Sequence, residues 1–108
     1  MKTLEYSVEK DEIKKSSSVN YSELVPGSGE TVNLKFIFSK DWDNTVKVVE
    51  FVTRDGVECE PQIVINDMCS IPEQALEEHI FHIRVLGKSI NNLFTTKKLT
   101  ICQSGGRR

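Results

Sequence analysis

Apolar residues alternate with polar ones along much of this chain, and this period of two limits the folds that are open to it. Residues 31–38 (TVNLKFIF) carry four apolar side chains on one face: Val32, Leu34, Phe36 and Phe38. Side chains two residues apart project from the same side of a β-strand, whereas a helical face needs spacings of three and four. The segment therefore predicts a half-buried strand that points Phe36 and Phe38 into a core.

Residues 45–53 (TVKVVEFVT) are apolar on both faces. Val49 and Phe51 point one way, and the opposite face carries Val46, Val48 and Val52. Valine and phenylalanine are enriched in strands, so we predict a strand with Phe51 in the core. Its second apolar face must be covered by another element or by a partner. We take Val46, Val48 and Val52 as candidate interface residues.

Turn signals divide the rest of the chain into further short strands. Asp55-Gly56 between apolar runs predicts a hairpin with a type I′ turn, because glycine accepts a positive φ. Pro61 cannot donate to a strand ladder and marks an edge or a break. We expect Gly87 to end the strand that contains it. Strands are also expected over residues 3–10, 19–24, 79–87 and 95–103.

Residues 72–78 (PEQALEE) form the one segment with helical composition. Pro72 suits the first turn of a helix, and the residues after it favour helix. Many short strands with one brief helix predict an all-β fold, namely an antiparallel β-sandwich of immunoglobulin-like or jelly-roll-like type. A chain of 108 residues is one domain. We assign it to residues 1–103, with fewer signals over residues 1–30, and expect residues 104–108 (SGGRR) to be a flexible tail.

Composition argues against several classes of protein. The formal net charge is -2 and the acids and bases are interspersed, so no basic surface for nucleic acid is expected. No run approaches the roughly 20 apolar residues that span a bilayer, and the first residues lack a signal-peptide core, which predicts synthesis in the cytoplasm. The three cysteines, Cys59, Cys69 and Cys102, are an odd number at irregular spacing, which favours reduced thiols over a disulfide scaffold.

The residues that could carry chemistry form no catalytic or metal-binding pattern. His79 and His82 are three residues apart, which places them on opposite faces of a strand and is poor for joint ligation of a metal. Asp41 and Asp43 lack the further ligands of a calcium loop. A Cys–His dyad stays open, but no spacing favours one. We therefore predict a protein that is not an enzyme, with no catalytic, cofactor-binding or metal-binding residue.

Trp42 is the only tryptophan and lies in a polar stretch, residues 39–44 (SKDWDN), between two predicted strands. Two interpretations are open. An exposed indole would serve as a recognition residue, whereas a connection that folds back over the end of the sandwich would bury the indole in the core. In the second case we expect the carboxylates of Asp41 and Asp43 to accept hydrogen bonds from the turn backbone.

The order of motifs over residues 31–103 resembles a known domain. The sequence VNLKFIFSKDWDNTVKVVEF is followed by an Asp-Gly turn, then INDMCSIPEQAL, FHIRVLG and LFTTKKLTICQSG. This order resembles the small β-sandwich domain at the N-terminus of bacteriophage and prophage tail proteins from Gram-positive hosts. Those are structural proteins of the upper-baseplate or tail-fibre type. The resemblance rests on the order and spacing of the motifs, since each motif alone is common.

The resemblance implies a virion component of the tail, made in the bacterial cytoplasm and needing no cofactor. Such a domain assembles with other tail or baseplate proteins, often as a homo-oligomer such as a trimer, and holds parts for host attachment. Nucleic acid and membrane insertion are not expected either, because of the charge distribution and the lack of a long apolar run described above. The chain is then either a free-standing structural protein or the anchoring piece of a longer fibre. In that family the tryptophan belongs to the architecture, so we expect Trp42 to cap the core.

A second class of function remains as an alternative, a ligand-binding or carbohydrate-binding β-sandwich. Such sites expose aromatic rings that stack on sugars. Aromatic residues make up only 7% of the chain, and most alternate inward on the predicted strands. The candidates for an exposed platform are Tyr6, Tyr21, Trp42 and Phe94.

Overall fold

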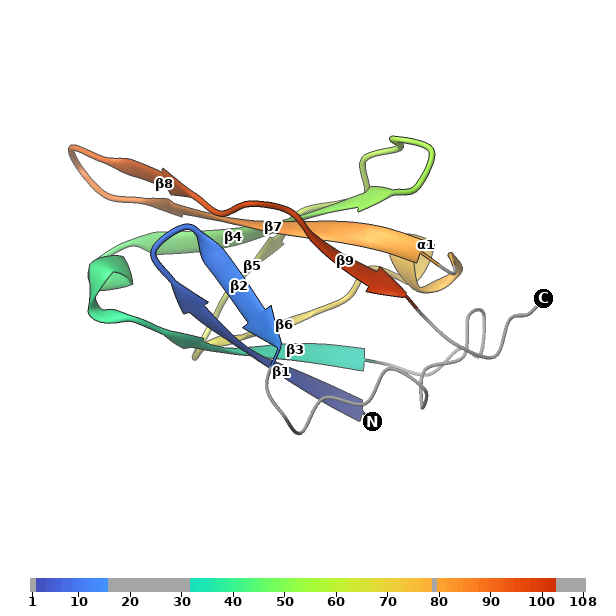
Figure 1. Cartoon of the computed structure of the whole chain (residues 1–108), viewed down its shortest axis with the longest axis horizontal. Coiled ribbons are helices and arrows are strands. Elements are labelled where there is room, and N and C mark those ends of the chain that lie inside the picture. The colour runs from blue at the N-terminus through green and yellow to red at the C-terminus, as the bar shows by residue number, and fades with distance from the viewer. Residues whose placement is uncertain (1, 16–31, 79, 103–108) are drawn as a thin grey trace.

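The computed structural model describes residues 2–15, 32–78 and 80–102, and it shows two β-sheets packed face to face (Figure 1). Sheet A has four strands in the order β2-β1-β3-β6. Their bounds are β1 Lys2–Glu9, β2 Glu12–Lys15, β3 Val32–Phe38 and β6 Met68–Ser70. The predicted all-β sandwich is confirmed.

Sheet B has five strands in the order β5-β4-β7-β8, with β9 also paired to β7. Their bounds are β4 Val46–Thr53, β5 Gln62–Ile63, β7 Ile80–Lys88, β8 Leu93–Thr95 and β9 Leu99–Cys102. β8 and β9 lie along the same edge of β7, and the register shifts by one residue between them, so that Lys97 and Lys98 together lie opposite Arg84. This β-bulge splits the strand that was expected over residues 95–103.

Among the strands that the structure describes, one pairing is parallel. β1 and β3 are parallel neighbours, with Leu4 opposite Leu34 and Tyr6 opposite Phe36. Parallel neighbours need a long connection, and residues 10–31, which include β2, supply one. β2 was not expected, because Ile13 is its one apolar residue and gives no alternation. The short strand expected over residues 19–24 lies outside the described residues, as does the expected tail.

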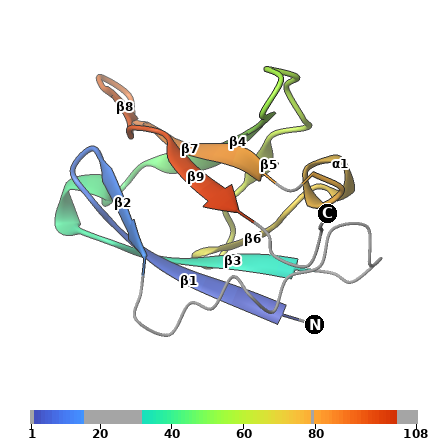
Figure 2. The same cartoon turned by 45° about the vertical axis from the view of Figure 1, so that its right-hand side comes forward.

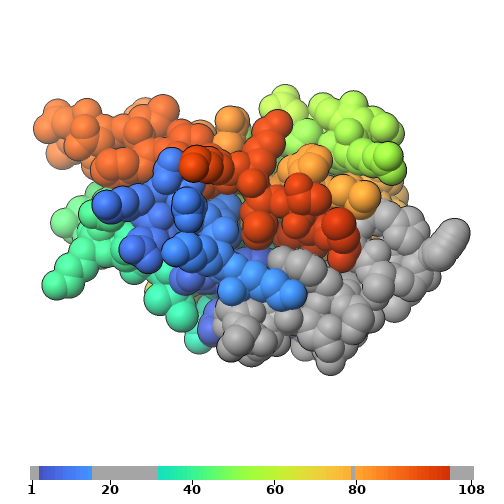
Figure 3. All heavy atoms as spheres, in the orientation of Figure 1, coloured from blue at the N-terminus to red at the C-terminus, as the bar shows by residue number. Residues whose placement is uncertain are grey.

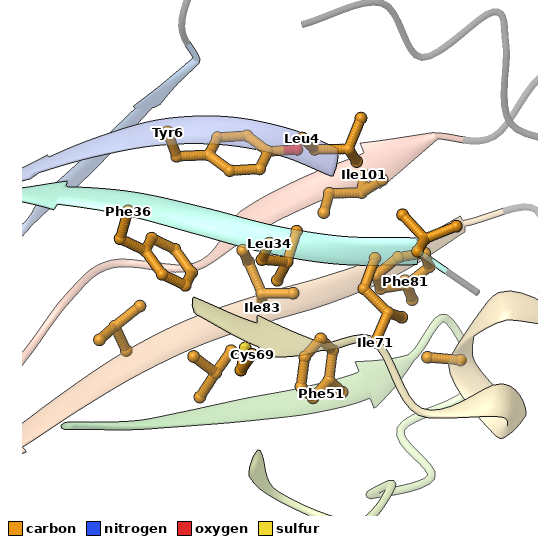
Figure 4. Close-up of a cluster of buried hydrophobic side chains, with 14 of the residues drawn as sticks. Leu4, Tyr6, Leu34, Phe36, Phe51, Cys69, Ile71, Phe81, Ile83 and Ile101 are labelled. Carbon is orange, nitrogen blue, oxygen red and sulfur yellow. The ribbon is translucent and has the colours of Figure 1, made fainter. Parts of the chain in front are cut away.

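The inward faces of both sheets form one core (Figure 4). Phe36 and Phe51 are each 1% exposed, and Phe38 is half-buried and packs against the same cluster. Burial of each such side chain contributes about 1.5–3 kcal/mol relative to exposure. The other large fully buried side chains are Tyr6, Val8, Leu34, Trp42, Val49, Phe81, Ile83, Val85 and Ile101.

The helix is shorter than residues 72–78. α1 spans Glu73–Leu76, and Pro72 directly precedes it. The carbonyl of Pro72 accepts hydrogen bonds from the N–H groups of Ala75, at 3.0 Å, and Leu76, at 3.1 Å. After Leu76 the N–H of Glu78 bonds to Ala75 at 3.1 Å, a tighter turn of the kind that ends helices.

The turn after β4 differs from the expected type I′ turn. The N–H of Thr53 donates to Val57 at 2.9 Å, and Gly56 has a φ of 89°. Asp55 is not among the residues with positive φ, whereas a type I′ turn needs two of them. The loop therefore has three residues, and the Thr53 hydroxyl stabilises it by accepting from the Val57 N–H at 3.0 Å.

The ends of the sandwich differ in what covers them. A 3-10 turn, η2 (Lys40–Trp42), lies with the β1–β2 and β7–β8 hairpins at one end, and α1 lies at the other (Figure 2). At the first end the N–H of Lys97, in the bulge of sheet B, donates to the carbonyl of Asp11 in the β1–β2 turn at 2.7 Å. This bond ties the two sheets together along one side.

Candidate interaction surface

Trp42 lies inside the molecule at the η2 end. It is 1% exposed, and its Nε1–H donates to the carbonyl of Lys10 at 3.0 Å. Its ring centroid lies 5.6 Å from that of Phe38 and 5.7 Å from that of Phe94. Phe38 belongs to sheet A and Phe94 to sheet B, so the indole fills the space between the sheets and leaves no ring face for a ligand.

The aspartates that flank Trp42 do not support the turn as expected. The backbone closes on itself, since the N–H of Trp42 donates to Ser39 and that of Asp43 to Lys40, both at 3.0 Å. The carboxylate of Asp41 accepts from the Ser39 hydroxyl at 3.3 Å instead of from backbone. A 3-10 turn satisfies these N–H groups with main-chain carbonyls, which leaves the side chains of Asp41 and Asp43 free to face solvent.

A depression of about 500 Å³ lies beside this corner and is lined by Lys10, Asp11, Asp41, Trp42, Phe94 and Thr95. Two of the aromatic residues that could stack on a sugar ring are buried. Tyr6 is 0% exposed and Trp42 is 1% exposed, so neither forms a platform. Phe94 is half-buried, and Tyr21 lies outside the described residues.

His82 and the two buried cysteines show no reactive arrangement. His82 Nδ1 lies 2.9 Å from the Thr100 hydroxyl, while His79 lies outside the described residues. Burial raises the pKa of Cys69 to about 12. It also raises the pKa of Cys59, to which the charge of Glu78 adds. A nucleophilic cysteine needs the opposite shift. Over residues 2–15, 32–78 and 80–102 no three acidic, His or Cys side chains are grouped as metal ligands.

The outer face of sheet B gathers apolar side chains from four strands, some of them exposed and some half-buried. Val48 lies opposite Ile63 on one side and Leu86 on the other. Residues that lie side by side across the strands form a row. In the row next to that of Val48, Lys88 lies between Val46 and Leu93. Val46 is 63% exposed, Ile63 61% and Leu93 65%. We call the five apolar residues of these rows the sheet-B patch: Val46, Val48, Ile63, Leu86 and Leu93.

A charged row follows the sheet-B patch along the same face. Glu50 lies opposite Arg84, whose Nε donates to the Glu50 carboxylate at 2.8 Å. Val52 lies beyond this ion pair, opposite His82. It lines a hollow of about 290 Å³ that includes Glu50, Glu58, His82, Arg84 and Lys98. The structure thus joins Val46 and Val48 into one patch and separates Val52 from it.

Comparisons with known proteins address the fold. No protein-family model matches the chain, and no curated protein matches it. Among solved structures it is similar to the N-terminal domain of phage TP901-1 ORF48, with a TM-score of 0.51 and 9% sequence identity. The match covers 93% of this chain and 96% of that one. The two chains share a fold. No helix in the described part of the chain has the length and apolar character to cross a membrane.

Proposed function

We propose that this protein is a non-enzymatic structural module of a bacteriophage or prophage tail, in the baseplate or a fibre. The observation that carries the proposal is the fold, which it shares from end to end with an N-terminal domain of a phage protein. The order of sequence motifs over residues 31–103, which resembles that of phage tail structural proteins, supports the same proposal. On this proposal residues 1–103 form one domain, and the protein resides in the virion tail after synthesis in the bacterial cytoplasm.

The surface of sheet B supports a role in protein–protein assembly. Apolar side chains scattered singly over a surface are ordinary, whereas contiguous ones mark interaction sites. The sheet-B patch is contiguous across β5, β4, β7 and β8, because its members are directly paired or one row apart. Other tail or baseplate proteins, and further copies of this chain, are the partners we propose. Nucleic acid and membranes are not.

Deletion of the gene from the phage or prophage tests this role. We expect particles with incomplete tail ends and a loss of adsorption, and we expect a plasmid copy to restore both. A copy with Val48→Asp should fail to restore them, because it buries a carboxylate in an apolar interface. A copy with Ile37→Asp is the matched control, since Ile37 is 55% exposed on β3 of the other sheet. Normal tails and adsorption after deletion would contradict the proposal.

Carbohydrate binding is the second candidate, and the depression beside Phe94 is the observation that favours it. Two carboxylates, those of Asp11 and Asp41, line it together with the phenyl ring of Phe94. Binding to cell-wall glycans that is lost in Phe94→Ala, with the fold retained, would support this function. If the wild-type chain did not bind cell-wall glycans, carbohydrate binding would be excluded as a function.

A further inference from the structure

The outer face of sheet B is organised in rows that run across β4 and β7. One row pairs apolar Val48 with apolar Leu86, and the next pairs acidic Glu50 with basic Arg84. From this pattern we propose that the face packs against the same face of a second copy of the chain. The two copies are related by a two-fold axis that runs between β4 and β7, parallel to them. This inference rests on the proposed assembly role and names its surface and partner.

A two-fold axis in this direction keeps each row in place and exchanges the two strands. Every residue of β4 then lies over the β7 residue of its own row in the second copy. Val48 meets Leu86 of the second copy, and Glu50 meets Arg84 of the second copy. Apolar side chains face apolar ones and acid faces base, which is what a self-complementary interface requires.

The row at the end of β4 fits the same arrangement. It places Val46 over Lys88 of the second copy, and a lysine covers apolar surface with its methylene stem while its ammonium reaches water. Val46 is 63% exposed in the single chain. Sheets that pack face to face lie about 10 Å apart, so the ion pairs of Glu50 and Arg84 become enclosed between the copies. Enclosure strengthens their attraction, since water screens it less, and this attraction has to offset the cost of removing the charges from water.

The projections beside this face agree with the axis. The loop after β4 projects above the face at the Thr53 end. It lies on the β5 side of β4, because Glu58 bridges to Val52 there. The β7–β8 hairpin rises at the opposite end, on the other side of β7. Figure 1 shows both projections above sheet B, and in Figure 3 they form the two upper corners of the molecule.

The two projections occupy diagonal corners of the face, so exchange of the strands brings each one over a low corner of the second copy. The hairpin tip carries Ile90, which is 99% exposed, and the corner that it approaches lies beside Ile65, which is 67% exposed. The two copies therefore interlock without collision, and two more exposed isoleucines come together. Stable pairs of proteins bury at least about 1,000 Å² in total, and the rows and both corners together extend the contact over the whole face.

Sedimentation equilibrium of the purified chain tests the pairing itself. We expect a dimer for the wild type, a monomer for Val48→Asp, and a dimer for the control Ile37→Asp, all with the same circular dichroism spectrum. A wild-type monomer at concentrations far above micromolar would overturn the proposal. A trimer would also overturn it, because a two-fold axis closes at two copies, as would a dimer that survives Val48→Asp.

Charge exchange between two separate variants tests whether the charged rows of the two copies face each other. Glu50→Arg alone sets arginine against Arg84 of the second copy, and Arg84→Glu alone sets glutamate against Glu50, so each variant should be monomeric. Mixed one to one, they should form a heterodimer, because every facing pair is then oppositely charged. Each variant lacks the ion pair between residues 50 and 84 of its own chain both before and after mixing. The loss of that pair therefore cannot explain why the variants associate only when they are mixed. Variants that dimerise alone, or that stay monomeric when mixed, would overturn the proposed geometry.

These measurements use the purified chain and do not depend on the phage. If deletion abolishes adsorption but the chain is monomeric, the tail role stands and the two-fold pairing fails. If the chain is a dimer but deletion leaves tails intact, the pairing stands and the tail role fails.

Discussion

The indole of Trp42 lies directly on the backbone of Gly87. A Cβ added at Gly87 would come within 2.6 Å of Cζ3 of Trp42, and Thr45 Oγ1 would lie 3.2 Å from it. Gly87 was expected to end its strand, but it lies inside β7, where it pairs with Lys47 and Phe94. The glycine is needed there because the ring occupies the space of a side chain.

Gly87→Ala should therefore lower the free energy of unfolding by about 1–3 kcal/mol, the range for an overpacked core. Urea denaturation measures the loss. In a Trp42→Leu background the same change should be much less harmful, because the smaller side chain leaves room for the methyl group. Gly56→Ala is the control. Nothing lies within 4 Å of its added Cβ, so its loss should stem from the positive φ alone and be the same in both backgrounds.

Trp42→Ala should lower the free energy of unfolding by about 3–5 kcal/mol, as other large-to-small changes in cores do. It empties the space between the sheets and removes the N–H that the Lys10 carbonyl accepts at 3.0 Å. The wild-type protein should also show blue-shifted tryptophan fluorescence that moves to the red on unfolding. A loss under about 1 kcal/mol, typical of a surface position, would show that the indole does not support the core.

Thr96 supplies the bond that fixes the bulge between β8 and β9. It is 3% exposed, and its hydroxyl accepts from the Val85 N–H at 2.9 Å. Thr96→Val keeps the shape but leaves that buried N–H without an acceptor, which should cost about 1–3 kcal/mol. Thr96→Ser keeps the hydroxyl and should cost less. Equal thermal stability of the two variants would mean that the hydroxyl contributes nothing.

The three cysteines should differ sharply toward a thiol reagent. Cys102 is exposed at the end of β9, whereas Cys59 and Cys69 are buried. We expect one thiol to react promptly in the native protein and the other two only when the chain unfolds, as followed by the colour released from an aromatic disulfide. Cys102→Ser should abolish the prompt reaction. Three prompt equivalents in the folded wild type would contradict the burial of Cys59 and Cys69.

Stability should fall in the alkaline range because of the buried thiols. Burial raises the pKa of Cys69 from 9.0 to about 12, so the folded chain holds its proton more tightly than the unfolded chain. The resulting stabilisation is complete below pH 9 and is lost as the pH rises toward 12. Each such group adds a slope of at most about 1.4 kcal/mol per pH unit. Cys69→Ala should make the midpoint of urea unfolding depend less on pH over this window. An unchanged slope would show that Cys69 does not titrate with unfolding.

Much of the sandwich follows from local patterns. The alternation of Phe36 with its neighbours predicts which face β3 buries, since a period of two has only two registers. The residues around Trp42 are polar and left two interpretations open, so the expectation that Trp42 caps the core came from the family resemblance. Its partners, Lys10 and Phe94, are 32 and 52 positions away in the sequence, and no local pattern connects them.

Local sequence patterns identify only part of the sheet-B patch. Val46 and Val48 stand out because β4 is apolar on both faces. Ile63, Leu86 and Leu93 join them only through the pairing of β5, β7 and β8, which depends on contacts between distant parts of the chain. The parallel pairing of β1 and β3 is also non-local, and alternation alone does not distinguish parallel from antiparallel neighbours.

The most direct test of a tail role is quantitative mass spectrometry of purified particles from cells that carry the gene, combined with antibody labelling in the electron microscope. We predict that the chain is found in intact particles at a fixed ratio to the tail proteins, with label on the tail. Its absence from intact, infectious particles made while the gene is expressed would contradict that role.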